Sequence, residues 1–184
     1  MGTLTRRGGL IASIILIAFG IGAVYMGIDG RSYVRDSLAQ EKIVGTPDSS
    51  IAGQKVDTGS EAKAFAEVMR EHTLEATGGK TYAEMDRFLA AKGGTTNDET
   101  AAKVENGKPV DNPARNIWVN ETALSNALNM SYFAEQVALF GLVMGIALLL
   151  TGIGFGIVSV RLLRKDREEA DMRVPAAGAV PAAS

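Results

Sequence analysis

The sequence contains no cysteine and only one histidine in 184 residues. Without thiols the chain forms no disulfide and offers no thiolate ligand to a metal. The single histidine, His72, has Glu75 three residues further on, a spacing that can place two ligands on one helix face. Carboxylates alone would have to complete such a metal site. We therefore favour a surface histidine and expect neither a metal nor any other cofactor.

Motifs that carry catalysis are also missing. Gly78-Gly79-Lys80-Thr81 ends like a phosphate-binding loop, but Leu74 stands where the first glycine of that motif belongs. The sequence shows no nucleophile elbow, and its carboxylates are interspersed with lysines and arginines, as on solvated helices. We predict that the protein is not an enzyme, and we expect no nucleic-acid partner.

Charge is absent from two long stretches. Gly8 to Ile28 is uncharged over 21 residues, and Val137 to Val160 is uncharged over 24 residues. A helix of the second length covers roughly 36 Å, enough to cross a hydrocarbon core of about 30 Å. The first stretch could be a cleaved signal peptide, but its apolar core exceeds the usual length and its cleavage site is poor. We favour an uncleaved anchor, and so predict two transmembrane helices.

The charges that flank these stretches predict their orientation. Residues 29–135 carry 17 acidic and 12 basic residues, whereas the two ends of the chain together carry 7 basic and 4 acidic residues. The positive-inside rule therefore places both termini in the cytoplasm. The basic residues next to the spans also suit anchoring to anionic lipid headgroups; they are Arg6, Arg7, Arg161, Arg164, Lys165 and Arg167.

The predicted fold is an all-α membrane protein in which two transmembrane helices flank a small helical extracytoplasmic domain. The second span forms part of one long helix, expected from about 113 to 170. The predicted division is a cytoplasmic tail (1–7), a first span (8–28), the extracytoplasmic domain (29–135), a second span (136–160) and a basic segment with an Ala/Pro tail (161–184).

Small residues form a stripe along each predicted span. At 100° per residue, each stripe occupies only about 40–60° of its helix surface, and small residues allow close approach of helix backbones. The stripes could face each other, a second copy or another protein. Their members are Gly9, Ser13, Gly20 and Gly27 in the first span, and Gly141, Gly145, Gly152 and Gly156 in the second.

Between the spans, two capping boxes predict two helices. Thr58 with Glu61 starts a helix that Gly78-Gly79 ends, and Thr81 with Glu84 starts a second that Gly93-Gly94 ends. Residues 95–109 are polar and predict a loop with at most one helical turn.

The long helix should begin after Asn112, a suitable N-cap before Pro113. We expect Trp118 to pack inside the extracytoplasmic domain, and Tyr132 and Phe133 to anchor the chain at the outer membrane interface.

The run from Pro113 to Phe155 (PARNIWVNETALSNALNMSYFAEQVALFGLVMGIALLLTGIGF), with GGKTYAEM at 78–85, resembles a group of small two-span membrane proteins from actinobacteria. The resemblance implies a bacterial plasma membrane and supplies no catalytic residue.

Taken together, these features predict an accessory or structural membrane protein. Its outer helical domain would bind a partner protein or an envelope component, with membrane lipids, another membrane or envelope protein, or further copies of itself as partners. The alternative is an extracytoplasmic sensor that binds a ligand. Because only 24 residues follow the second span, such a sensor would signal through a separate partner.

Overall fold

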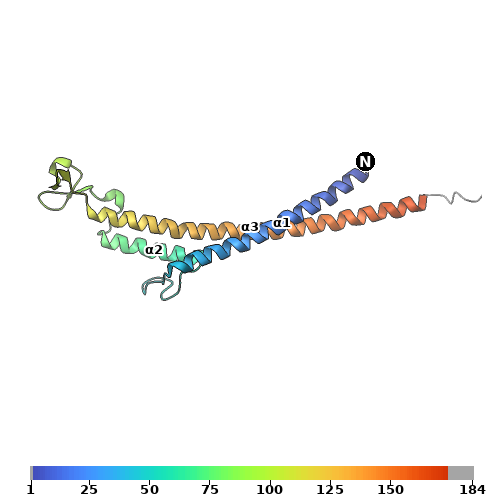
Figure 1. The fold of residues 1–184 in the computed structure, drawn as a ribbon, viewed down its shortest axis with the longest axis horizontal. Coiled ribbons are helices and arrows are strands. Elements are labelled where there is room, and N and C mark those ends of the chain that lie inside the picture. Colours follow the sequence, from blue (N-terminus) through green and yellow to red (C-terminus); the bar gives the residue numbers. More distant parts are fainter. Residues whose placement is uncertain (1, 174–184) are drawn as a thin grey trace, which may run out of the picture. The chain divides into compact units, whose positions relative to one another are not determined.

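The computed structural model describes residues 2–173, with the side chains of residues 2–7, 166, 170, 171 and 173 left out. The predicted Ala/Pro tail from 174 onward and the side chains of Arg6 and Arg7 therefore lie outside the described part. Three helices dominate the chain (Figure 1): α1 (Gly2–Glu41), α2 (Gly59–Ala76) and α3 (Pro113–Arg173). By length and composition, α1 and α3 are each able to cross a membrane. The expectation of a mostly helical chain with two long apolar helices is confirmed.

The chain forms two compact units. One contains the chain up to Asp29 together with the segment from Ala138 onward, and we call it the apolar unit. The other is Gly30–Val137, which we call the helical domain. Helices α1 and α3 each contribute to both units. Helix α3 runs without a break from Pro113 through the second uncharged stretch, so the predicted long helix is present.

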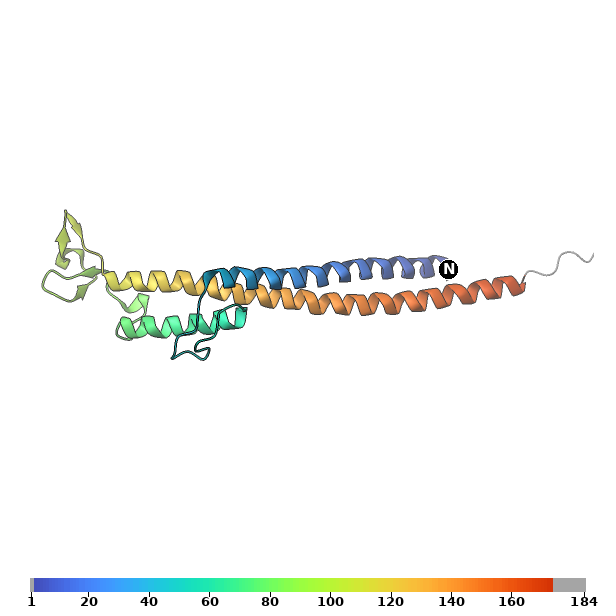
Figure 2. The same ribbon diagram turned by 60° about the horizontal axis from the view of Figure 1, so that its bottom comes forward.

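In the helical domain, α2 lies beside the N-terminal part of α3 (Figure 2). The predicted capping box forms, since the Glu61 backbone N–H bonds to the Thr58 hydroxyl and the Glu61 carboxylate accepts from the Thr58 N–H. At the other end Gly78 and Gly79 adopt positive φ, and the Gly79 N–H donates to the Leu74 carbonyl at 2.7 Å. Both predicted ends of this helix are therefore correct.

The core of the helical domain is small. Residues from the C-terminal part of α1, from the loop after it, from α2 and from α3 pack together there. The buried members are Val34, Leu38, Ile51, Val56, Ala62, Ala66 and Leu128. Further along α3, Trp118 is 3% exposed and its indole N–H donates to the Lys80 carbonyl at 2.9 Å. The expectation that Trp118 packs within this domain is confirmed.

The second capping box does not start a helix, and this prediction was wrong. Thr81 and Glu84 do bond, but they enclose only the 3₁₀ turn η1 (Tyr82–Glu84), after which Met85 is extended. The stretch is too short to form a stable helix alone. Its backbone instead makes long-range bonds, such as that from the Leu89 N–H to the Val110 carbonyl at 3.0 Å.

Two short antiparallel ladders follow, so the described chain is not entirely α-helical. Strand β1 (Phe88–Leu89) pairs with β2 (Thr95–Thr96), and β3 (Val104–Glu105) pairs with β4 (Lys108–Pro109). The 3₁₀ turn η2 (Glu99–Ala101) lies between them. The prediction that residues 95–109 form a loop with at most one helical turn was therefore wrong about the strands β2, β3 and β4, whose backbone pairing no local pattern indicates. Gly93 and Gly94, at φ of 95° and 79°, form the β1–β2 turn rather than a helix end.

Candidate functional site

The structure brings the two small-residue stripes of the apolar unit together. A Cβ atom on Gly145 would lie 2.7 Å from the Val24 nitrogen and 2.9 Å from the Gly20 carbonyl oxygen. A Cβ atom on Gly27 would lie 2.8 Å from the Ala138 carbonyl oxygen. Real Cβ atoms do not approach backbone atoms so closely, so α1 and α3 can pack at this spacing only with glycine at these positions.

Hydroxyl groups extend the same contact. The Ser13 hydroxyl is buried and donates to the Gly152 carbonyl at 2.8 Å, across from α1 to α3. Gly9 faces Ser159, and Gly156 faces Ser13. Gly141 lies at the edge of the contact, where a Cβ atom would be 3.9 Å from the Ala23 carbonyl oxygen. Of the three possibilities left open by the sequence, the structure has the two stripes against each other.

The residues expected to anchor the chain are mostly exposed. Phe133 is 60% exposed, and Tyr132 is half-buried with the Lys63 ammonium 5.3 Å from its ring centroid. The exposed cations of the C-terminal part of α3 are Arg161, Arg164, Lys165 and Arg167.

The helical domain contains an apolar groove that is a candidate binding site. It has a volume of about 650 Å³ and lies where the end of α1 meets α2 and α3. Most of its surface is hydrocarbon, and three polar side chains border it. The lining residues are Ser37, Leu38, Glu41, Ile43, Phe65, Met69, Leu124, Ala127, Leu128 and Ser131.

The groove exists because α1 ends at Glu41 while α2 and α3 continue. On α2, the apolar side chains of Phe65 and Met69 are only half-buried and line the groove. On α3, Ile117 and Leu124 remain 41% and 56% exposed. This domain therefore leaves part of its apolar helix surface without a partner from the described chain.

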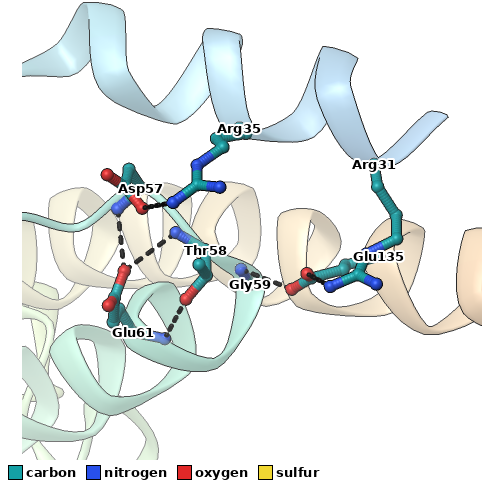
Figure 3. Close-up of polar contacts among 7 residues, drawn as sticks. All are labelled: Arg31, Arg35, Asp57, Thr58, Gly59, Glu61 and Glu135. Carbon is teal, nitrogen blue, oxygen red and sulfur yellow. Dashed lines mark hydrogen bonds and ion pairs between the residues drawn. The ribbon is translucent and has the colours of Figure 1, made fainter. Parts of the chain in front are cut away.

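A polar cluster joins all three helices at the other end of the domain (Figure 3). Glu135 of α3 accepts a hydrogen bond from the Gly59 N–H, in the first turn of α2, at 2.8 Å. It also pairs with Arg31 of α1 at 3.2 Å. The Glu135 side chain is 14% exposed and Arg31 is 48% exposed. A carboxylate at a helix N-terminus is favoured by the partial positive charge there, so Glu135 fixes the position of α2 against α3.

Arg35 and Asp57 form the second half of this cluster. The Arg35 guanidinium lies 3.3 Å from the Asp57 carboxylate, which precedes the α2 N-cap (Figure 3). Burial opposes ionisation of Glu61, but N–H bonds from Asp57 and Thr58 outweigh it, so the pKa of Glu61 is lowered. The contacts of the cluster are structural: Glu135 and Asp57 bond to other segments of the domain, and Glu61 bonds to the backbone that begins α2.

His72 does not approach a metal-like set of ligands. Its Nε2 lies 2.5 Å from the Asp48 carboxylate in the loop between α1 and α2. This hydrogen bond raises the pKa of His72 and lowers the pKa of Asp48 to about 2. Among the described residues, no three histidine, aspartate or glutamate side chains are grouped to hold a metal ion.

Sequence reasoning missed the groove and the polar cluster for one reason. Both form where α1, α2 and α3 pack against one another, and no local pattern encodes that packing. One signal was available: Ile117 and Leu124 are apolar residues seven positions apart, and that spacing places them on one face of α3.

Comparison with models of protein families, with curated proteins and with solved structures gives no match.

Proposed function

We propose that this protein is a membrane-anchored accessory protein whose helical domain binds a helix of a partner membrane or envelope protein in the apolar groove. The observation that carries the proposal is the partly uncovered apolar surface of α2 and α3 around the groove. Helix-in-groove binding needs such a surface, because the partner helix inserts apolar side chains spaced three or four residues apart.

The proposal includes the topology predicted from the charges. Both α1 and α3 cross the membrane, both termini are cytoplasmic, and the helical domain lies outside a bacterial plasma membrane. Support comes from the two long apolar helices and the asymmetric charge distribution. The bacterial setting rests on the resemblance in residues 113–155.

Cysteine labelling tests this topology without a background signal, because the chain has no cysteine of its own. Tyr33 and Met172 are 74% and 78% exposed, so Tyr33→Cys and Met172→Cys should both be accessible to reagents on their own side. A membrane-impermeant maleimide should label position 33 in intact cells, and position 172 only after permeabilisation. Labelling of both positions in intact cells would contradict the topology.

Two exposed apolar residues of α3 provide a matched test of the groove. Leu124 lines the groove and is 56% exposed, whereas Met130 is 62% exposed and does not line it. A photo-crosslinking amino acid at position 124 should join the protein to one defined partner polypeptide in its native membrane, and one at position 130 should not. Leu124→Glu should abolish co-purification of that partner, while Met130→Glu should retain it.

The other outcomes of this test are equally informative. Cross-linking at 124 to a second copy of the chain would make the groove a homo-oligomer interface and replace the accessory role. Equal loss of the partner in both glutamate variants would show that the groove is not the binding surface.

The second candidate is an extracytoplasmic sensor for an apolar small molecule, favoured by the size of the groove. A volume of about 650 Å³ is typical of sites for small molecules. Such a ligand would be extracted by organic solvent from the gently purified protein and identified by mass spectrometry. It should be absent from Leu124→Glu and present in Met130→Glu.

A further inference from the structure

A small polar cleft at the start of α3 contains two arginines that the proposed function does not use. The cleft has a volume of about 270 Å³ and lies within the helical domain, away from the apolar groove. Arg87 directly precedes β1, and Arg115 lies in the first turn of α3. The Asn116 side chain also lines the cleft.

Neither arginine forms an ion pair with a carboxylate of the described residues, although each is held in place by an aromatic ring. The Arg115 guanidinium lies 4.0 Å from the centroid of the Tyr82 ring, and that of Arg87 lies 4.9 Å from the Phe88 ring. Stacking of this kind orients the guanidinium plane and leaves N–H groups free to bond at its edge. Within the described chain, the Arg115 Nε is also buried without a hydrogen-bond partner.

The backbone around the cleft is firmly positioned. The Arg87 N–H donates to the Asn97 side chain at 3.0 Å, and its carbonyl accepts from the Asn112 N–H at 2.8 Å. Asn112 in turn caps α3, since its side-chain oxygen accepts from the Ala114 N–H at 3.1 Å. The backbone of Arg87 is therefore tied directly to the beginning of the helix that carries Arg115, so the two residues need no backbone rearrangement to act on one ligand.

We propose that this cleft binds a small oxyanion group, either a carboxylate or a phosphate, through Arg87 and Arg115. The forked N–H groups of a guanidinium match both groups in geometry and charge. The Asn116 amide, which also lines the cleft, adds a neutral donor. The positive end of the 61-residue helix α3 favours an anion at the same place.

One lining residue opposes an anion. The Asp111 carboxylate borders the cleft, and it forms no ion pair with a described residue. Because two guanidinium groups face one carboxylate, the lining keeps a net positive charge. The Asp111 carboxylate therefore lowers the affinity of the cleft for an anion, and replacing this residue by a neutral one should strengthen binding.

The first experiment uses the full-length protein in detergent with ¹⁵N-labelled arginine. Acetate and inorganic phosphate are each titrated at constant ionic strength, with acetamide as an uncharged isostere of acetate. The Nε–H resonances of Arg87 and Arg115 should shift and saturate with acetate, phosphate or both, and acetamide should have no effect. The stronger of the two anions identifies the group as a carboxylate or a phosphate. Equal shifts with sodium chloride would overturn the proposal.

Variants separate a built site from general charge attraction. Arg87→Gln should weaken binding at least about tenfold, the loss expected for one charge-assisted hydrogen bond. Asp111→Asn should strengthen binding several-fold because it removes the opposing charge. Lys92→Gln changes the net charge by the same amount outside the cleft and should leave binding unchanged. If Lys92→Gln weakens binding as much as Arg87→Gln does, no specific site exists.

Discussion

The contact between α1 and α3 in the apolar unit leads to the sharpest prediction, because the two helices touch through glycine. Gly145 and Gly154 lie in the same apolar stretch of α3. A Cβ atom on Gly145 would stand 2.7 Å from the Val24 nitrogen and 2.9 Å from the Gly20 carbonyl oxygen, whereas one on Gly154 would have no neighbour within 4 Å. Gly145→Ala and Gly154→Ala are therefore the same chemical change with and without a steric clash.

The expected magnitude follows from the two distances. Carbon atoms pack at about 3.5–4.0 Å, so Gly145→Ala must move the backbones apart by several tenths of an ångström to 1 Å. Overpacking of this kind costs about 1–3 kcal/mol. Both variants gain the same helix propensity, about 1 kcal/mol for Gly→Ala in a helix interior. The difference in unfolding free energy between them should therefore be about 1–3 kcal/mol, with Gly145→Ala the less stable.

Two measurements check this difference. The first is the unfolding of the purified protein as SDS is added to a mild detergent. The second is the distance between spin labels at Phe19→Cys and Leu150→Cys, two positions that are 70% and 67% exposed. The label distance should increase for Gly145→Ala and stay constant for Gly154→Ala. Equal stability and equal label distances in the two variants would refute the glycine-dependent contact.

Two further predictions concern the helical domain. Glu135→Ala should destabilise it by about 1–3 kcal/mol, because the Gly59 N–H loses a charged acceptor. Arg31→Ala should cost less than about 1 kcal/mol, because it removes only an exposed ion pair. Equal losses of unfolding free energy in chemical denaturation would contradict this ranking. The His72–Asp48 contact should hold at mildly acidic pH, because the pKa of His72 is higher in the folded than in the unfolded protein. The stabilisation is complete when the pH is below the pKa of His72 in the unfolded protein, and it is lost as pH rises through the pKa in the folded protein. Asp48, with its pKa lowered to about 2, contributes at any pH above its unfolded value of 3.8. Amide exchange, corrected for its intrinsic pH dependence, should therefore show the loop around Asp48 opening more readily at high pH, and Asp48→Asn should remove this pH dependence.

Local sequence patterns determined most of the secondary structure. The two uncharged stretches lie in α1 and α3, since the α-helix is the conformation in which every backbone group of a long apolar run bonds within its own segment. The Thr58–Glu61 capping box and Gly78-Gly79 set the ends of α2 because caps depend on residues within one turn. The same pattern at Thr81–Glu84 misled, because the segment after it forms backbone bonds to Thr95–Thr96 and Val110, which lie further along the chain.

The tertiary structure alone decided the candidate sites. The stripe of Gly145 and its neighbours predicted close packing, but only the fold placed it against the stripe of α1. The apolar groove follows from the point at which α1 ends beside α2 and α3, and the arginine cleft from the approach of Arg87 to the start of α3. Helix formation depends on neighbours a few residues apart, which a sequence displays directly. Sites form where segments distant in the chain meet, and their positions follow from the packing of the whole domain.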